Sequence, residues 1–253
     1  MALISIVTVC HNSAKTIVST VESVLVQIYS PLEYIVIDGA SDDGSQELVT
    51  SYGSAISFFL SEPDAGIADA FNKGIRQAGG EVIALINSDD VLLPGALEQV
   101  ADFFRNNPTV HVMHGDVLLY EGSRFIKRIK PAGRWWYPWR LVLFNHPATF
   151  VRREVYEKWG LFDVSYAIAM DVEIFLRWLR KGVTIAYLPD TLVAIQAGGV
   201  SGRSALQGYR EVKRALSAHG YSALLANIQY FARFGLHLIV VTQEKLREFG
   251  WVK

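Results

Sequence analysis

Short apolar runs alternate with amphipathic stretches along the first hundred residues of the chain. Apolar runs that suit strands buried on both faces lie at residues 3–9, 34–37, 56–60 and 82–86. Four stretches with apolar residues at helical spacing follow these runs. The first covers about 15–27, the second begins at about Ser45, the third ends at Ala78 and the fourth covers 94–100. Strands that alternate with helices at this spacing predict an α/β fold with a mostly parallel, doubly wound sheet.

The pattern changes after Pro108. Residues 110–120 and 124–129 predict a β-hairpin, a strand at 149–151 precedes a helix from about Arg153, and closing strands are expected at 184–188 and 192–195. From residue 205 onward, helical spacing predicts two helices at about 208–219 and 223–249. We therefore predict a domain over residues 1–204, with halves at 1–107 and 108–204, and a helical extension over 205–253.

Small polar or acidic residues follow each strand of the first half. They are Thr8 and Asn12, Asp38, Asp64, and then Asn87 and Asp89. Because the carboxyl ends of parallel strands meet at one edge of a sheet, we expect one crevice to collect these side chains.

The neighbouring acids Asp89 and Asp90 close the strand at 82–86. Two adjacent carboxylates repel each other and lose water, so the pair is costly unless a divalent cation or helix amides stabilise it. A helix cap for the stretch that follows Pro94 is the alternative interpretation. Neither a G-x-G-x-x-G after the first strand nor a G-x-x-x-x-G-K-S/T occurs, so phosphate would need a metal.

Charge is balanced overall but unevenly placed. The 253 residues carry 24 Lys and Arg against 25 Asp and Glu, so a net charge of −1 gives no general attraction to nucleic acid. Asp and Glu outnumber Lys and Arg between Asp38 and Asp102. From Gly122 to Arg153 there are several Lys and Arg residues and no Asp or Glu. An acidic site beside a basic face is therefore expected.

The single cysteine, Cys10, excludes a disulfide within the chain and favours a reducing compartment. The first residues have no basic leader, so we expect no signal peptide and a cytoplasmic protein. The apolar stretch at 228–241 is interrupted by Gln229, Arg233 and His237, and it is too short to span a bilayer. It predicts an amphipathic or core helix.

Four motifs in order carry a family resemblance. They are Ile6-Val7-Thr8-Val9-Cys10-His11-Asn12, Val36-Ile37-Asp38-Gly39-Ala40-Ser41-Asp42-Asp43, the stretch from Asp64 to Gly74, and Asn87-Ser88-Asp89-Asp90. Together they resemble family 2 glycosyltransferases over roughly residues 4–204, and look closest to bacterial members that build O-antigen, capsule or other surface polysaccharide. The resemblance implies the GT-A fold, a nucleoside-diphosphate sugar (UDP-linked), a divalent metal (Mn²⁺ or Mg²⁺) and inverting transfer to a glycan or lipid-linked acceptor.

The resemblance also implies roles for individual residues of the first half. The nucleotide-binding set is Thr8, Cys10, Asn12, Asp38, Asp64, Asn72, Lys73, Asn87 and Ser88. Within it, Asp38 is expected to accept a hydrogen bond from the base. Asp89 is the first choice for metal ligand and Asp90 the second. Two departures stand out, because Asn87 replaces the family's usual first aspartate and Phe71 stands where many members have an arginine.

A second signature begins at Gly160 and continues through Arg177. It resembles the family's glycine-x-phenylalanine-aspartate turn and the acid pair that opens a helix, with Asp171 at the position of the catalytic base and Met170 where glutamate is common. Inversion needs one carboxylate to take the proton of the attacking hydroxyl. A helix start would keep it ionised. An ordinary helix cap for Asp171, and an i,i+4 surface pair for Glu173 and Arg177, are the structural alternatives.

Acceptor contacts are expected from the second half. The candidates are Trp135, Trp136, His146 and Asp163, with Arg203 on a mobile lid formed by residues 196–203. Aromatic and cationic residues at 134–140 suit an anionic, lipid-linked acceptor, and they equally suit a surface helix packed on the sheet. His146 is alternatively a turn residue before Pro147.

Several alternatives stay open. The C-terminal helices would cover the sheet, form a homodimer contact or touch an anionic membrane surface. A sugar-phosphate nucleotidyltransferase shares much of such a sheet, but Cys10-His11-Asn12-Ser13 is unlike its glycine-rich phosphate loop. A nucleotide-sugar-binding protein without transfer activity is the alternative that is not an enzyme.

Overall fold

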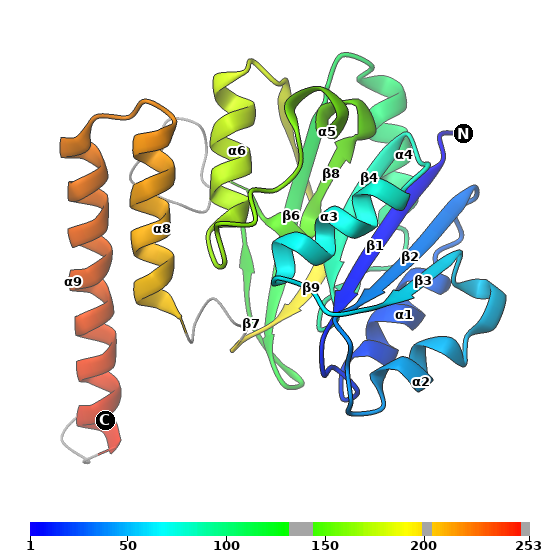
Figure 1. Ribbon diagram of the computed structural model, residues 1–253, viewed down its shortest axis with the longest axis horizontal. Coiled ribbons are helices and arrows are strands. Elements are labelled where there is room, and N and C mark those ends of the chain that lie inside the picture. The colour runs from blue at the N-terminus through cyan, green and yellow to red at the C-terminus, as the bar shows by residue number, and fades with distance from the viewer. Residues whose placement is uncertain (132–143, 199–203, 249–253) are drawn as a thin grey trace.

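The computed structural model describes residues 1–131, 144–198 and 204–248, with side chains described as far as Gly235 in the last helix. Within this part of the chain, nine strands form one sheet with helices on both faces (Figure 1). The strands are β1 (Ile4–Cys10), β2 (Leu32–Asp38), β3 (Phe58–Ser61), β4 (Val82–Asn87), β5 (Val91–Leu92), β6 (Val112–Glu121), β7 (Arg124–Ile129), β8 (Thr149–Arg152) and β9 (Ile185–Gln196). The helices are α1 (Ile17–Leu25), α2 (Ser45–Thr50), α3 (Ile67–Gln77), α4 (Ala96–Asn106), α5 (Arg153–Trp159), α6 (Met170–Arg180), α8 (Ala205–Ala218) and α9 (Ala223–Glu248), with short 3-10 turns η1 (Gly53–Ala55) and η3 (His146–Ala148).

The first half of the sheet is parallel, as the sequence predicts. β1 lies between β2 and β4, and β3 lies outside β2. The register pairs Cys10 with Asp38 and Asp38 with Ser61, so these three strands end level with one another. The polar residues that follow the strands therefore start from one edge of the sheet.

The second half of the sheet is mixed. β8 runs antiparallel to both β4 and β6, whereas β9 runs parallel to β6 and antiparallel to β5. β7 folds back on the outer half of β6 and completes the predicted hairpin. Periodicity predicts these strands but not their directions, which depend on how the connecting segments cross the sheet.

β9 is one strand where the sequence predicts two. Residues 112–114 of β6 pair with 185–187, and the pairing resumes at Thr191 after register shifts on either side of Asp116. Because β6 supplies partners on both sides of this irregularity, the strand continues through Pro189. The predicted break between residues 188 and 192 is wrong.

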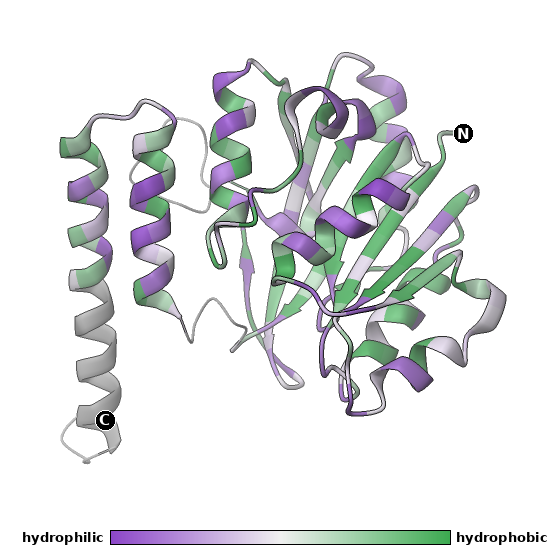
Figure 2. Ribbon diagram, viewed as in Figure 1, coloured by the Kyte–Doolittle hydropathy of each residue, from purple (hydrophilic) through white to green (hydrophobic). Residues whose placement is uncertain are grey.

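Two hydrophobic clusters lie on the two faces of the sheet. Side chains of β1 alternate between them, with Val7 and Val9 in one cluster and Ile4 and Ile6 in the other. Helices α3, α5, α6, α8 and α9 contribute to the first cluster, and α1, α2 and α4 to the second. Figure 2 shows hydrophobic residues along most of the central strands. Burial on both faces explains why these strands read as continuous apolar runs.

Gly74 brings α3 directly against the sheet. A Cβ atom on Gly74 would lie only 2.2 Å from Cγ1 of Val7, so a side chain at this position would push the helix away from β1. Close packing of α3 against β1 therefore requires a glycine at this position of the third motif.

The C-terminal helices pack side by side at the edge of the molecule. α8 contributes Val212, Ala215 and Leu216 to the core cluster that α6 also joins. α9 lies against the other side of α8, away from the sheet (Figure 1). Among the described residues, no helix combines the length and apolar character needed to cross a membrane.

Candidate functional site

The ends of β1, β2 and β3 meet around Asp38. This carboxylate is fully buried, and it accepts hydrogen bonds from the amide of Ser41 at 2.9 Å, the Ser41 hydroxyl at 2.5 Å and the Ser61 hydroxyl at 2.7 Å. Burial alone would raise the pKa of Asp38, but these hydrogen bonds outweigh it and hold the pKa below its ordinary value. Asp38 is therefore an ionised group at the predicted edge of the sheet.

The loops after these strands share hydrogen bonds. Asn12 has a positive φ of 50°, and its Oδ1 accepts a hydrogen bond from the amide of Asp42 at 3.0 Å. Gly39 lies between His11 and Asp64, because a Cβ atom there would be 3.3 Å from the His11 Nδ1 and 2.6 Å from the Asp64 Oδ2. The structure thus brings Asn12, Asp38 and Asp64 together, as the strand-end pattern predicts.

Thr8 and Cys10 lie beneath this rim rather than on it. Thr8 is fully buried and its hydroxyl shares a hydrogen bond of 3.1 Å with the Tyr34 hydroxyl. Cys10 is nearly buried, and its thiol donates to the Asp38 Oδ1 at 3.4 Å. Burial, followed by the neighbouring Asp38 charge, raises the pKa of the Cys10 thiol. In this structure the Cys10 thiol supports Asp38 from inside the protein, whereas Thr8 binds Tyr34.

The end of β4 joins the same rim. The Ser88 hydroxyl shares a hydrogen bond of 2.7 Å with the hydroxyl of Ser13, which follows β1. The Asn87 Nδ2 donates to the Asp90 Oδ2 at 2.8 Å. The segment Asn87-Ser88-Asp89-Asp90 is therefore tied to the loop after β1.

Asp89 and Asp90 are neighbouring carboxylates with little exposure to solvent. Asp89 is partly exposed, whereas Asp90 is only 4% exposed. Burial raises the pKa of Asp89 above its ordinary value, and burial together with the Asp89 charge raises the pKa of Asp90 to about 7. Among the described residues, no group of three His, Cys, Asp or Glu side chains is arranged for a metal ion. A cation here would need ligand oxygens in addition to these two carboxylates.

Two residues of α3 that the sequence predicts at the nucleotide, Asn72 and Lys73, have bonding partners within the protein. The Asn72 side chain is 3% exposed, donates to the Phe162 carbonyl and accepts from the Phe162 amide, both at 2.9 Å. Lys73 donates to the Pro63 carbonyl at 2.8 Å and lies 2.9 Å from Glu62 and 3.5 Å from Asp69. The polar groups of both side chains are therefore already bonded within the protein in this structure.

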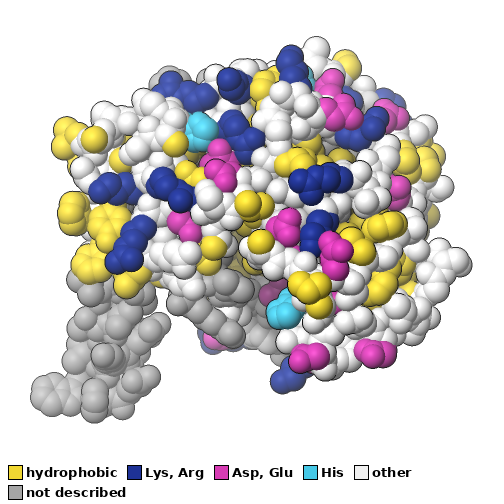
Figure 3. Space-filling view, in the orientation of Figure 1, with side chains coloured by type: hydrophobic (Ala, Val, Ile, Leu, Met, Phe, Trp, Pro, Cys, Tyr) yellow, Lys and Arg dark blue, Asp and Glu magenta, His cyan; other side chains and the backbone are white. Residues whose placement is uncertain are grey.

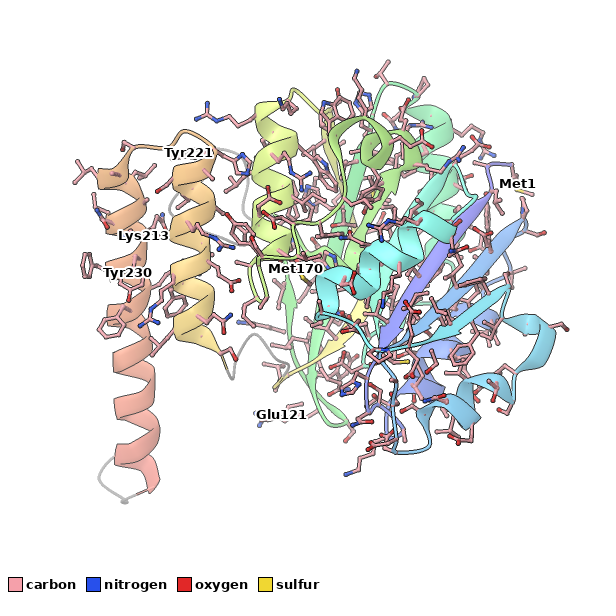
Figure 4. All side chains as sticks on the ribbon, viewed as in Figure 1. Met1, Glu121, Met170, Lys213, Tyr221 and Tyr230 are labelled. Carbon is pink, nitrogen blue, oxygen red and sulfur yellow. The ribbon has the colours of Figure 1, made fainter. Side chains whose placement is uncertain are left out.

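Asp171 lies in the first turn of α6 and is partly exposed. Its Oδ1 accepts a hydrogen bond from the Val172 amide at 2.7 Å. Burial raises the pKa of the Asp171 carboxyl to about 6, although backbone hydrogen bonds act in the opposite direction. Burial therefore outweighs the effect of the helix start on this pKa, but a value of about 6 still leaves Asp171 ionised at neutral pH, as expected from the sequence. In the view of Figure 4, Met170, at the start of α6, lies toward the end of the sheet where β1 and β4 finish.

Two of the four candidate acceptor residues, His146 and Asp163, lie within the described part of the chain. His146 packs against Phe71 and Phe162 with ring centroids 5.3 and 6.1 Å away, and its Nε2 is buried without a partner among the described residues. Burial lowers the pKa of His146 to about 4, so its ring is neutral, and the half-buried side chain packs among aromatic residues. Asp163 is exposed and accepts from the Ser165 amide at 2.9 Å. Trp135, Trp136 and Arg203 lie outside the described residues.

Glu173 and Glu211 are buried acids whose burial was not predicted from the sequence. The surface pair of Glu173 and Arg177, given above as the structural alternative, does form, but Glu173 is only 6% exposed and also lies 3.0 Å from the His219 Nε2. Glu211 of α8 is 8% exposed and accepts hydrogen bonds from the loop before α6. An acid among apolar residues at helical spacing was the available signal for Glu211, but its partners lie more than forty residues away in the chain.

Solved structures share this architecture. TarS of S. aureus, crystallised with UDP, superposes with a TM-score of 0.69 at 18% identity, covering 92% of this chain and 71% of that one. Mannosyltransferase PcManGT from Pyrobaculum calidifontis, solved with GDP-Man and Mn²⁺, gives a TM-score of 0.65 at 16% identity, covering 97% of this chain and 80% of that one. The predicted GT-A fold is confirmed.

Sequence relatives agree with the structural ones. The chain is 27% identical over 188 residues to an uncharacterized glycosyltransferase of Rickettsia typhi. The aligned region covers 70% of this chain and 59% of that relative. An uncharacterized glycosyltransferase of Mycobacterium tuberculosis is 28% identical over 181 residues, covering 69% of this chain and 68% of the relative. The family model described as glycosyl transferase family 2 matches residues 5–176. Because that match covers more than half of the chain, this chain, which spans 59% of the length of the Rickettsia typhi relative, belongs to glycosyl transferase family 2.

Proposed function

We propose that this glycosyltransferase moves a sugar from a UDP-linked donor to a hydroxyl group of a glycan or lipid-linked acceptor in surface polysaccharide synthesis, with inversion at the anomeric carbon. The observation that carries the proposal is the rim formed by the ends of β1 to β4, which finishes in the desolvated carboxylates Asp89 and Asp90. Solved relatives bound to UDP and to GDP-Man support a nucleotide-linked donor.

Asp89 and Asp90 are the residues that would hold a divalent cation, Mn²⁺ or Mg²⁺. Their raised pKa values support this assignment, because a hard cation would stabilise both carboxylates in the ionised form that burial disfavours. When bound, the cation neutralises the diphosphate leaving group. The PcManGT structure with Mn²⁺ supports a divalent ion in this fold.

The donor nucleoside would lie on the rim at Asn12, Asp38 and Asp64. Asp38 is ionised and suited to accept from a base N–H, as the N3–H of uracil requires. Because Asp38 is fully buried, that contact needs the Ser61 hydroxyl to turn away from its Oδ2. Asn72 and Lys73 are left out of the proposed donor contacts, since Phe162 and the acids around α3 occupy them.

Asp171 is the proposed base. Its carboxylate takes the proton of the acceptor hydroxyl while that oxygen attacks the anomeric carbon from the face opposite the diphosphate, and the bond from carbon to phosphate oxygen breaks. A pKa of about 6 suits this role, because the group is ionised at neutral pH and still basic enough to accept the proton.

The acceptor is proposed to be anionic and lipid-linked. The described part of the basic face includes β7, where Arg124 and Lys127 are exposed beside Phe125, which is 52% exposed. Cations suit acceptor phosphates, and an exposed aromatic ring suits a sugar or an acyl chain.

Peripheral contact with an anionic membrane is proposed for the α8–α9 surface. A groove of about 440 Å³ is lined by Arg210, Lys213, Arg214, Ser217 and Tyr230. Beside it, the outer side of α9 exposes Leu224, Ile228 and Phe231 (Figure 3). Cations next to an apolar ridge are the combination that binds an anionic lipid interface.

The activity test uses UDP-glucose, UDP-galactose, UDP-N-acetylglucosamine and GDP-mannose with octyl glycosides as acceptors. Release of the nucleoside diphosphate that depends on both Mn²⁺ and acceptor would support the proposal. Donor binding without release would favour a binding protein. Pyrophosphate formation from a nucleoside triphosphate and a sugar phosphate would identify a nucleotidyltransferase.

A further inference from the structure

A carboxylate on α8 binds the backbone of the loop that leads into α6. The Glu211 side chain accepts hydrogen bonds from the amides of Ala167 at 3.2 Å, Ile168 at 2.8 Å and Ala169 at 2.9 Å. Gln207, one turn earlier on α8, donates to the Glu211 Oε1 at 2.8 Å. Both Glu211 oxygens are therefore used, and three consecutive peptide groups are held in one arrangement.

Other residues of α8 hold the same loop. The Arg214 guanidinium donates to the Ser165 carbonyl at 2.7 Å and lies 3.7 Å from the centroid of the Tyr166 ring. Gly208 lies against Ile168, because a Cβ atom on Gly208 would be 3.1 Å from the Ile168 Cγ2. The loop from Ser165 to Ala169 thus follows the surface of α8.

Glu211 works as an ionised group. Burial would raise the pKa of its carboxyl, but the hydrogen bonds from the loop amides and Gln207 outweigh burial and lower the pKa. Burying a charge is costly, and an apolar residue would join two helices more cheaply. The position of the charge therefore points to a need for a fixed loop rather than for helix packing alone.

The loop ends at the proposed base. Ala169, the last residue bound by Glu211, is the N-cap of α6, and Asp171 follows two residues later. Amides at a helix start otherwise lack partners within the helix. The Asp171 Oδ1 accepts from the Val172 amide, so the orientation of its carboxylate depends on the backbone of this first turn.

We propose that Glu211 is a positioning residue for sugar transfer, which fixes the backbone of residues 167–169 and thereby sets the Asp171 carboxylate where it meets the acceptor hydroxyl. This inference rests on the proposed function of Asp171. It assigns α8 to the active site as the support of the base, although the family match ends at residue 176 and does not include this helix.

The experiment compares Glu211→Gln with Val212→Ala. Val212 is the next residue of α8, is 5% exposed and packs in the core, so its truncation tests loss of helix packing without loss of the carboxylate. Glu211→Gln should lower kcat by roughly 10- to 100-fold, because a misplaced base loses reactive geometry. The KM for the nucleotide sugar should stay unchanged. Val212→Ala should lower Tm at least as much and keep the wild-type kcat.

Hydrogen–deuterium exchange supplies a readout that needs no substrate. Glu211→Gln should speed exchange of the amides of residues 167–172, and Val212→Ala should leave them protected. Arg214→Met is the second variant should Glu211→Gln fail to fold, because Arg214 is exposed and contacts the same loop. It should give a smaller loss of kcat with the same unchanged KM.

The outcomes separate this inference from the proposed function. A Glu211→Gln enzyme with wild-type kcat overturns the positioning role, and so does an equal fall of kcat in Val212→Ala at a comparable loss of Tm. Full turnover in Asp171→Asn contradicts the proposed base instead. Loss of transfer in Asp171→Asn with normal transfer in Glu211→Gln leaves the function standing and removes Glu211 from it.

Discussion

Asp38 and Asp171 show how surroundings divide the work between two carboxylates. Hydroxyl and amide donors from Ser41 and Ser61 hold the pKa of Asp38 below its ordinary value, which keeps it an acceptor at every physiological pH. Asp171 has fewer donors, and burial raises its pKa to about 6. The first group suits permanent recognition, and the second suits proton transfer.

Asp171→Asn should abolish transfer while keeping the donor site. We expect turnover to fall by about 10²- to 10⁴-fold, because the amide cannot accept the hydroxyl proton. In the wild-type enzyme, kcat/KM should fall as pH drops through about 6, since protonation of Asp171 removes the base. Nucleotide-release assays across pH and calorimetric titration of the donor measure both effects. A flat acidic limb would speak against Asp171.

Asp89→Asn and Asp90→Asn test the metal site. Mn²⁺ should raise the Tm of the wild-type protein in the presence of UDP, because a ligand bound only to the folded state stabilises it by mass action, by about 2.7 kcal/mol at a hundred times Kd. Each variant should lose most of this increase. Asp102→Asn on α4 is the control, since this exposed acid pairs only with Arg105 among the described residues. Equal Mn²⁺ shifts in all three variants would refute the assignment.

At the scale of elements, α3 is joined to the loop before α6 by Asn72. Asn72→Ala should lower the free energy of unfolding by about 2 kcal/mol or more, because the Phe162 amide and carbonyl lose their partner while buried. Donor affinity should stay unchanged if the tether is its only role. Urea unfolding and calorimetric titration of the donor give the two quantities. Weaker donor binding at unchanged stability would restore the nucleotide contact that the sequence predicts.

Elements were predictable from the sequence where local pattern decides them. β1, β2 and β4 are largely buried on both faces and β3 is partly buried, and their apolar runs indicated all four strands directly. The continuity of β9 was not predictable, because it depends on pairing with β6 on both sides of a register shift. The role of Asn72 was hidden too, since its partner Phe162 lies 90 positions along the chain. Spacing placed Glu173 beside Arg177 correctly but gave no information on burial.

At the scale of the whole molecule, α6 and the loop before it lie between the rim at the ends of β1 to β4 and the α8–α9 surface. The rim belongs to the carboxyl ends of β1 to β4, and α6 carries the proposed base beside α8. α8 presents Glu211 to the loop before α6 and Lys213 to Tyr230 of α9, at 5.7 Å from the ring centroid (Figure 4). A surface bound through α8 and α9 would therefore lie next to the element that supports the base.

Binding to vesicles tests the outer face of these helices. The protein should co-sediment with phosphatidylglycerol vesicles and not with phosphatidylcholine vesicles, and added salt should release it. Arg210→Glu with Lys213→Glu should weaken binding by more than tenfold, since each cation near an anionic surface contributes about 1 kcal/mol. Phe231→Glu should weaken it as well, because that ring is 65% exposed beside the groove. Arg105→Glu on α4 should bind normally, since α4 covers the opposite face of the sheet from α8. Equal binding to both lipids, or equal losses in all variants, would contradict a membrane contact at this surface. A concentration-dependent dimer that Phe231→Glu disrupts would instead assign the exposed apolar side of α9 to contact with a second copy of the chain.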